Sequence, residues 1–197
     1  MDNSRDQEPL EESEALKKYI RIANDFEKLL NNTPASQYDL PTPCSDWNIS
    51  ALICHVFNTH FSVASQATEL EAPQANPNND LGQQWETAKT SIIELLANPD
   101  SAAKVISGMF GTQSFESLAG NLLCADLLFH TWDLAKATGQ DDLLDVDAMA
   151  QTLSFLEPLD EAIRRPGGFA PKITPSEGDD LQTKFLNFGG RSINWSA

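Results

Sequence analysis

The sequence has few basic residues, few cysteines and no long hydrophobic run, and each shortage excludes a class of protein. With 13 Lys and Arg against 29 Asp and Glu, the formal net charge is -16, which disfavours nucleic acids and anionic membranes as partners. The three cysteines (Cys44, Cys54 and Cys124) form no CxxC pair, so we expect small core residues rather than disulfides or a thiolate zinc site. No segment could span a bilayer and the acidic N-terminus does not resemble a secretory signal, so we expect a cytoplasmic protein.

The chain also lacks the period-two alternation of β-strands beyond a few residues at a time. Apolar residues recur instead at helical spacing, in segments near 16–30, 45–64, 81–96 and 145–163, with a short helix near 180–186. A further, central helix begins near 114–117 and ends at 139. We therefore predict an all-α, single-domain chain (1–197). Its parts are an up-and-down four-helix bundle at 9–140, and a fifth helix with a loop-rich C-terminal extension at 141–197.

Local signals set the expected limits of these helices. Ser45 is a good N-cap for the second helix, and Asp46 favours its positive end. The segment Val105–Phe115 reads as an extended connection, and Pro158 should kink the fifth helix. Gly139 supplies the left-handed residue that ends the central helix.

The central helix, AGNLLCADLLFHTWDLAKATG (119–139), is apolar on nearly all sides, which is typical of an interior helix. Asp126 and His130 stand one turn apart on the same side of it. Burying an imidazole and a carboxylate without partners costs several kcal/mol, roughly. The rest of the chain must therefore supply partners for this pair.

His55, on an apolar side of the second helix, is the partner that the sequence offers. If the two helices are neighbours, His55, Asp126 and His130 can meet inside the bundle. Two imidazoles and one carboxylate form a ligand set for a divalent transition metal, with zinc favoured over nickel or iron(II), and three ligands leave a position open for chemistry. The alternative is a buried hydrogen-bonded cluster without a metal.

Two long motifs resemble a known family. The segment TPCSDWNISALICHVFNTHFSVA (42–64) and the segment LLCADLLFHTWDLAKATGQ (122–140) resemble the motifs of the DinB-like metal-binding four-helix bundles. The relevant branch is typified by the N-terminal domain of mycothiol-dependent maleylpyruvate isomerase. The tail GGFAPKITPSEGDDLQTKFLNFGGR (167–191) resembles the ending of short actinobacterial members.

This resemblance implies one divalent metal bound by His55, Asp126 and His130, with mycothiol or a similar thiol as cosubstrate. The chain departs from the branch in two respects. Asp126 stands where the isomerase branch has glutamate, and the residues after the bundle are too few for the second domain of the two-domain isomerase.

Two functional hypotheses follow. The first is a metal-dependent enzyme that uses a low-molecular-weight thiol for S-transfer to, or isomerisation of, a small electrophile, with the loops 71–80 and 164–176 forming the mouth of the site. The second is a non-enzymatic bundle that binds a metal or a small ligand. The sequence leaves the oligomeric state open, a homodimer included.

Other candidate residues have a structural interpretation beside the functional one. Asp133 could orient a metal ligand or hold a helix end. His60 lies about 140° round the helix from His55 and is interpreted as pocket lining or surface. We expect Trp47 and Trp132 to serve packing. Arg164 and Arg165 fit a surface helix end better than contact with an anionic substrate.

Overall fold

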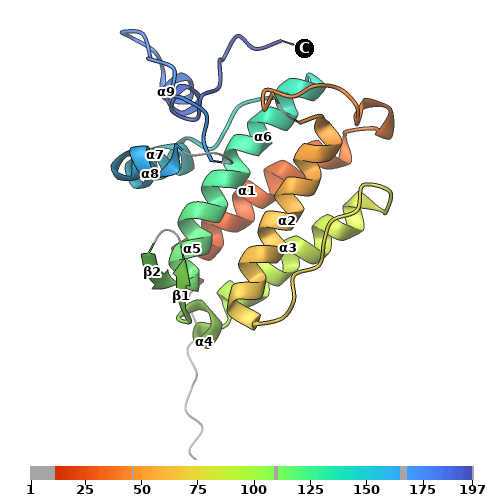
Figure 1. Cartoon of the computed structure of the whole chain (residues 1–197), viewed down its shortest axis with the longest axis vertical. Coiled ribbons are helices and arrows are strands. Elements are labelled where there is room, and N and C mark those ends of the chain that lie inside the picture. The colour runs from red at the N-terminus through yellow and green to blue at the C-terminus, as the bar shows by residue number, and fades with distance from the viewer. Residues whose placement is uncertain (1–11, 46, 109–110, 165–167, 197) are drawn as a thin grey trace, which may run out of the picture.

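Four long helices form the centre of the computed structural model (Figure 1). They are α1 (Glu14–Asn31), α2 (Ile49–Thr68), α3 (Leu81–Ala97) and α6 (Cys124–Thr138). Helices α1 and α2 each pack against both α3 and α6, so all four enclose one core. The structure describes residues 12–45, 47–108, 111–164 and 168–196. The predicted beginning of the bundle at 9–11 lies outside this range.

The apolar stripes predicted from the sequence supply the core. Tyr19 and Phe26 from α1, Phe57 from α2 and Trp85 from α3 are each at most 1% exposed. Nearly every residue of α6 is buried, which confirms that the central helix is an interior helix. Among the described residues, no helix has both the length and the apolar character needed to cross a membrane.

Helix α2 begins later than predicted. Its N-cap is Asn48, whose side chain accepts a hydrogen bond from the Ala51 amide, so the prediction of Ser45 as the cap is wrong. The preceding residues form their own turn because the Thr42 hydroxyl donates to the carbonyl of Trp47 at 2.9 Å. A short 3₁₀ turn, η1 (Ala35–Gln37), lies between α1 and this segment. The predicted role of Asp46 falls on a residue outside the described range.

The central helix begins and ends where the sequence predicts, but it is not α-helical throughout. It starts as α5 (Phe115–Leu118) after the cap Ser114, continues as a π-helical turn, η2 (Ala119–Leu123), and becomes α6. Gly139 ends it with φ of 67°. A Cβ atom at Gly120 would lie 3.0 Å from the Cβ of Ala15, so glycine permits α1 to approach this turn closely.

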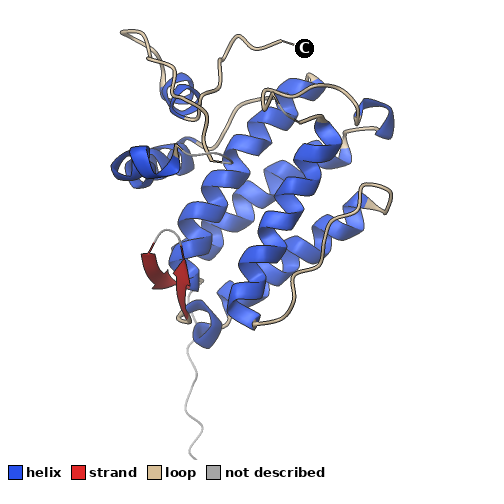
Figure 2. Cartoon of the chain, viewed as in Figure 1, coloured by secondary structure: helices blue, strands red, loops and turns tan. Residues whose placement is uncertain are grey.

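The segment predicted to be an extended connection, Val105–Phe115, contains two short β-strands that pair with each other. After the short helix α4 (Pro99–Ala102), β1 (Val105–Gly108) and β2 (Gly111–Ser114) form an antiparallel pair in which Val105 faces Ser114. This small hairpin lies beside α5, and Figure 2 shows it as the red element at the lower end of a mostly helical chain. The chain is thus mostly helical rather than entirely so.

The C-terminal extension covers one side of α6. It contains α7 (Val146–Leu156), the 3₁₀ turn η3 (Glu157–Leu159), α8 (Asp160–Ile163) and α9 (Leu181–Phe188). Pro158 lies in η3, so the predicted fifth helix is interrupted there rather than only bent. The Phe129 ring of α6 stacks on Phe185 of α9, with 4.1 Å between ring centroids.

Candidate metal centre

The structure brings His55, Asp126 and His130 together, as the sequence predicts. His55 comes from α2, and the other two residues project from neighbouring turns of α6. The Asp126 Oδ1 atom lies 3.1 Å from His55 Nε2 and 3.6 Å from His130 Nε2. One ligand atom from each of the three residues lies within 4.8 Å of the other two.

This arrangement fits a divalent transition metal. Ligand atoms around a tetrahedral zinc ion, at about 2.0–2.2 Å from the metal, lie about 3.3–3.5 Å from one another. The two distances at Asp126 Oδ1 bracket that value. The second carboxylate oxygen, Asp126 Oδ2, is buried without a hydrogen-bond partner, which is costly unless something else coordinates it. The donor set and this unpartnered oxygen both match a bound cation.

Asp133 fixes the orientation of the His130 ring. The His130 Nδ1–H group donates to Asp133 Oδ2 at 3.0 Å, and Asp133 is fully buried. Because this bond occupies Nδ1, the other ring nitrogen, Nε2, points toward Asp126. A carboxylate behind a ligating imidazole is the usual arrangement in metal sites, where it holds the tautomer and raises ligand basicity.

Arg191 is a member of the site that sequence reasoning missed. It follows α9, is 8% exposed, and donates to Asp133 Oδ2 from Nη2 at 2.9 Å and to Asp133 Oδ1 from Nε at 3.3 Å. A third bond runs from Nη1 to the Gly189 carbonyl at 2.7 Å. No helical periodicity marks this arginine, because it lies in an irregular segment. Its only sequence signal is its place at the end of the 167–191 motif.

The electrostatics of the site follow from this chain of contacts. Burial acts to raise the pKa of Asp126, but His130 and then His55 outweigh it and hold that pKa well below its usual range. Burial acts to lower the pKa of His130, yet Asp126 and Asp133 raise it to about 9. Arg191 and His130 similarly overcome burial and lower the pKa of Asp133. Alternating charges therefore extend from Asp126 through His130 and Asp133 to Arg191.

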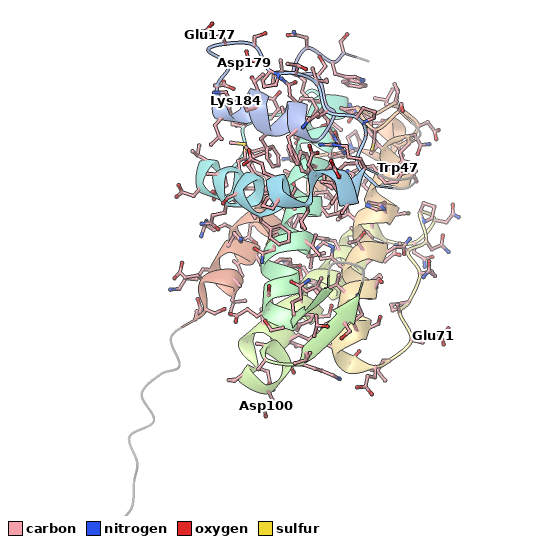
Figure 3. All side chains as sticks on the ribbon, turned by 60° about the vertical axis from the view of Figure 1, so that its left-hand side comes forward. Trp47, Glu71, Asp100, Glu177, Asp179 and Lys184 are labelled. Carbon is pink, nitrogen blue, oxygen red and sulfur yellow. The ribbon has the colours of Figure 1, made fainter. Side chains whose placement is uncertain are left out.

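Trp47 covers the two imidazoles on one side. Its ring centroid lies 4.4 Å from that of His55 and 5.4 Å from that of His130. In Figure 3, Trp47 and Lys184 of α9 lie in the upper part of the view, and Asp100 of α4 lies at the lower end. The packing role predicted for Trp47 thus acts on the site itself, whereas Trp132 is wholly buried in the core.

A second grouping, Cys44 with His130 and Asp133, also has its ligand atoms within 4.8 Å of one another. The Arg191 guanidinium already lies there, with Nη2 3.7 Å from Cys44 Sγ. A permanent positive charge in this position disfavours a metal ion. The grouping that contains Asp126 is therefore the better metal site.

The interpretation of His60 as pocket lining or surface is wrong. His60 is fully buried between Tyr19 and Trp85, with ring centroids 5.8 Å and 5.0 Å away. Its Nδ1–H group donates to the Val56 carbonyl at 2.7 Å, and its Nε2 atom has no hydrogen-bond partner. Burial lowers the pKa of His60 to about 4, so the ring is neutral at physiological pH. It is a core residue.

Two other predictions concern residues near the site. The prediction of small core residues holds for Cys124, which is buried, but not for Cys44 and Cys54, which are only partly buried. Arg164 is engaged by the protein: it donates to Asp160, to the Ala170 carbonyl and to the Phe188 carbonyl, so it ties the C-terminal extension together. Arg165 lies outside the described residues.

A pocket of about 390 Å³ opens onto Asp126 from the side of the hairpin. Its described walls come from α2, the hairpin, the π-helical turn η2, and the ends of α7 and α8. Gly168 and Phe169, within the predicted mouth loop 164–176, contribute to it, but no residue of the loop 71–80 does. The π-helical turn, a feature often found at functional sites, therefore lines the same pocket as Asp126.

The fold and the site together define a class: a mostly helical protein with a His–Asp–His centre between two of its long helices. The chain belongs to the mycothiol maleylpyruvate isomerase N-terminal domain family, whose sequence profile matches residues 20–135. It is 34% identical over 134 residues to two uncharacterized proteins of Mycobacterium tuberculosis, MT0763 of strain CDC 1551 and Rv0738 of strain H37Rv. Each match covers 68% of this chain and 72% of the relative. No solved structure matches the chain.

Proposed function

We propose that this protein is a divalent-metal-dependent enzyme that uses a low-molecular-weight thiol of the mycothiol type on a small electrophile. The observation that carries this proposal is the convergence of His55 and His130 on Asp126, whose Oδ2 atom is buried without a partner. Membership of the mycothiol maleylpyruvate isomerase N-terminal domain family supports the choice of thiol. The four long helices would form the DinB-like four-helix bundle that the resemblance implies, in a cytoplasmic protein.

His55 Nε2, His130 Nε2 and a carboxylate oxygen of Asp126 would hold the metal, with zinc the first candidate and nickel or iron(II) the others. When bound, such a cation lowers the pKa of a thiol, so that the nucleophilic thiolate is available near neutral pH. Asp133 and Arg191 keep the His130 ring in the binding orientation. Trp47 shields the imidazoles from water on its side.

The proposed reaction is addition of the thiolate sulfur to an electrophilic carbon. In S-transfer, the new sulfur–carbon bond is kept and the displaced electron pair leaves with the leaving group or takes up a proton. In isomerisation, the same bond breaks again after rotation about the former double bond, and the thiolate is released unchanged. The Asp126 pocket provides the space in which the electrophile would meet the thiol.

Asp126 in place of the family glutamate is the main local difference. An aspartate side chain is one methylene shorter, so α6 would have to lie closer to a bound metal. The 3.1 Å and 3.6 Å distances from Asp126 Oδ1 to the two imidazoles support a ligand role for aspartate at this position.

The alternative is a non-enzymatic protein that binds a metal or a small ligand. The observation that favours it is the apolar character of the pocket, since such a pocket can hold a ligand without any reaction. Both proposals involve the same residues. They differ in whether the protein catalyses a reaction of the bound ligand.

The test is thiol-dependent turnover of a panel of electrophiles by protein grown with zinc and nickel. We expect turnover that requires both metal and thiol and that is abolished in His55→Ala and His130→Ala. The matched control is His60→Phe, which removes the third histidine without touching the centre and should keep the activity. Metal binding without turnover over the whole panel would support the binding protein instead.

A further inference from the structure

The side chains that line the pocket beside Asp126 determine which ligands it can hold. Its walls are mainly apolar, with Val63 from α2, Ile106 from β1, Leu122 from the π-helical turn, Ile163 from α8 and Phe169 from the following segment. Its volume of about 390 Å³ is in the usual range for a small-molecule site. A ligand that fills it would be surrounded by hydrocarbon on most sides.

The polar groups of the pocket are few and mostly uncharged. Thr59 supplies a hydroxyl, and Gln66 and Gln113 supply amides that can donate to a carbonyl oxygen. Among the described lining residues, Asp126 is the only one with an ionisable side chain, and none is a lysine or an arginine. The nearby Arg164 is bound to Asp160 and to backbone carbonyls, so it is already occupied within the protein.

We infer that this pocket takes a neutral, largely apolar electrophile, such as an unsaturated ester or ketone, in preference to a dicarboxylate such as maleylpyruvate. This inference rests on the proposed function, because it names the substrate class of the same site. Transfer of a carboxylate into an apolar wall is expensive unless a cation or several donors meet it. The net charge of -16 further repels a doubly charged acid as it approaches.

The test compares methyl cinnamate with cinnamate, which share a carbon skeleton and differ in one charge. Binding to the whole metal-free protein is measured by ligand-observed NMR, because a zinc ion at Asp126 would itself attract the acid. We expect the ester to bind at least about tenfold more tightly than the acid. Equal or tighter binding of the acid to the metal-free protein would overturn the inference.

A variant that adds a positive charge to the pocket tests whether the ligand binds there. Gln66 lines the pocket and is exposed, so Gln66→Lys should fold normally and should raise the affinity for cinnamate several-fold while leaving the ester little changed. The control is Val105→Lys, which adds the same charge on the hairpin at a residue that is 67% exposed and not among the pocket residues. An identical response of both variants would place the binding elsewhere and contradict the inference.

The two proposals can fail separately. If the protein binds no metal but still prefers the ester in this pocket, the enzymatic proposal fails while the pocket assignment stands. If thiol-dependent turnover is found but dicarboxylates are converted faster than their neutral esters, the function stands and this inference is wrong.

Discussion

Arg191 and Asp133 form a buried ion pair that joins the C-terminal segment to the helix carrying the candidate metal ligands. The pair makes two hydrogen bonds, and Asp133 uses the same Oδ2 atom to hold the His130 ring. Folding of the C-terminal extension and orientation of His130 are therefore linked through one carboxylate. A change in this ion pair should therefore alter both the free energy of unfolding and the metal affinity.

Arg191→Met should destabilise the protein and weaken the metal centre together. Loss of one partner of a buried ion pair typically costs about 3–5 kcal/mol of unfolding free energy, and because Asp133 keeps its bond to His130, we expect a loss toward the lower end of that range. Loosening of a carboxylate behind a ligating histidine typically lowers metal affinity by about 10- to 100-fold. Urea unfolding of metal-free protein and zinc titration measure the two effects. Arg191→Lys, which keeps the charge, is the control, and an unaltered zinc affinity in the Met variant would refute the link.

Asp126→Asn should reduce zinc affinity strongly, whereas Asp126→Glu should retain binding. The amide keeps the size of the side chain but removes the negative charge and offers a weaker ligand oxygen. Glutamate keeps the negative charge and both carboxylate oxygens on a side chain one methylene longer. Competition with a chromophoric zinc chelator measures all three proteins. Equal affinity of the Asn variant and the parent would show that the carboxylate is not a ligand.

Gly189→Ala should destabilise the docking of the C-terminal extension. A Cβ atom at this position would overlap the Phe129 ring, which is held by its stack on Phe185. Overpacking of this kind costs about 1–3 kcal/mol. Gly108→Ala is the matched control, because in the described part of the chain nothing lies within 4 Å of a Cβ atom there. Thermal unfolding should separate the two variants, and equal midpoints would contradict the packing described here.

His60 should make the protein less stable as the pH falls. Its pKa is about 4 in the folded protein and near 6.5 in an unfolded chain, so the unfolded state binds the proton first. The contribution of His60 to the free energy of unfolding is at its maximum above about pH 6.5. It decreases by roughly 3 kcal/mol as the pH falls toward 4. Urea unfolding of His60→Phe from pH 7 to 4 should therefore show a shallower loss than the parent.

The groups around His60 are the same in the parent protein and in His60→Phe, so the comparison controls for their titration. Tyr19 and Trp85 contact its ring from α1 and α3, and Asp126 and His55 act on it electrostatically. These groups are present in both proteins, so the difference between the two pH profiles reports on His60. Parallel profiles would mean that this imidazole titrates normally in the folded state.

The sequence predicted the parts of the structure that depend on helical periodicity. The stripe of apolar residues placed His55 on the inner side of α2, and the i, i+4 spacing placed Asp126 and His130 on one side of α6. Gly139 marked the end of that helix correctly. These are local rules, in which side-chain direction follows directly from position along a helix.

The parts that the sequence did not predict depend on contacts between distant segments. Arg191 lies 58 residues from Asp133, and no spacing rule relates them. The burial of His60 depends on the proximity of α1 and α3. The helix does not begin at Ser45 because residues 42–47 form a turn. In that turn the Thr42 hydroxyl donates to the carbonyls of Cys44 and Trp47, and the turn brings Trp47 over the imidazoles.

The most direct test of the metal centre is titration of metal-free protein with cobalt(II), followed by its absorption spectrum. We predict one equivalent of cobalt bound with nitrogen and oxygen ligands, without the intense thiolate charge-transfer band that coordination by Cys44 would produce. Binding should disappear in His55→Ala and in His130→Ala and should persist in His60→Phe. A spectrum with a thiolate band, or no bound cobalt in the parent protein, would contradict a centre made by His55, Asp126 and His130.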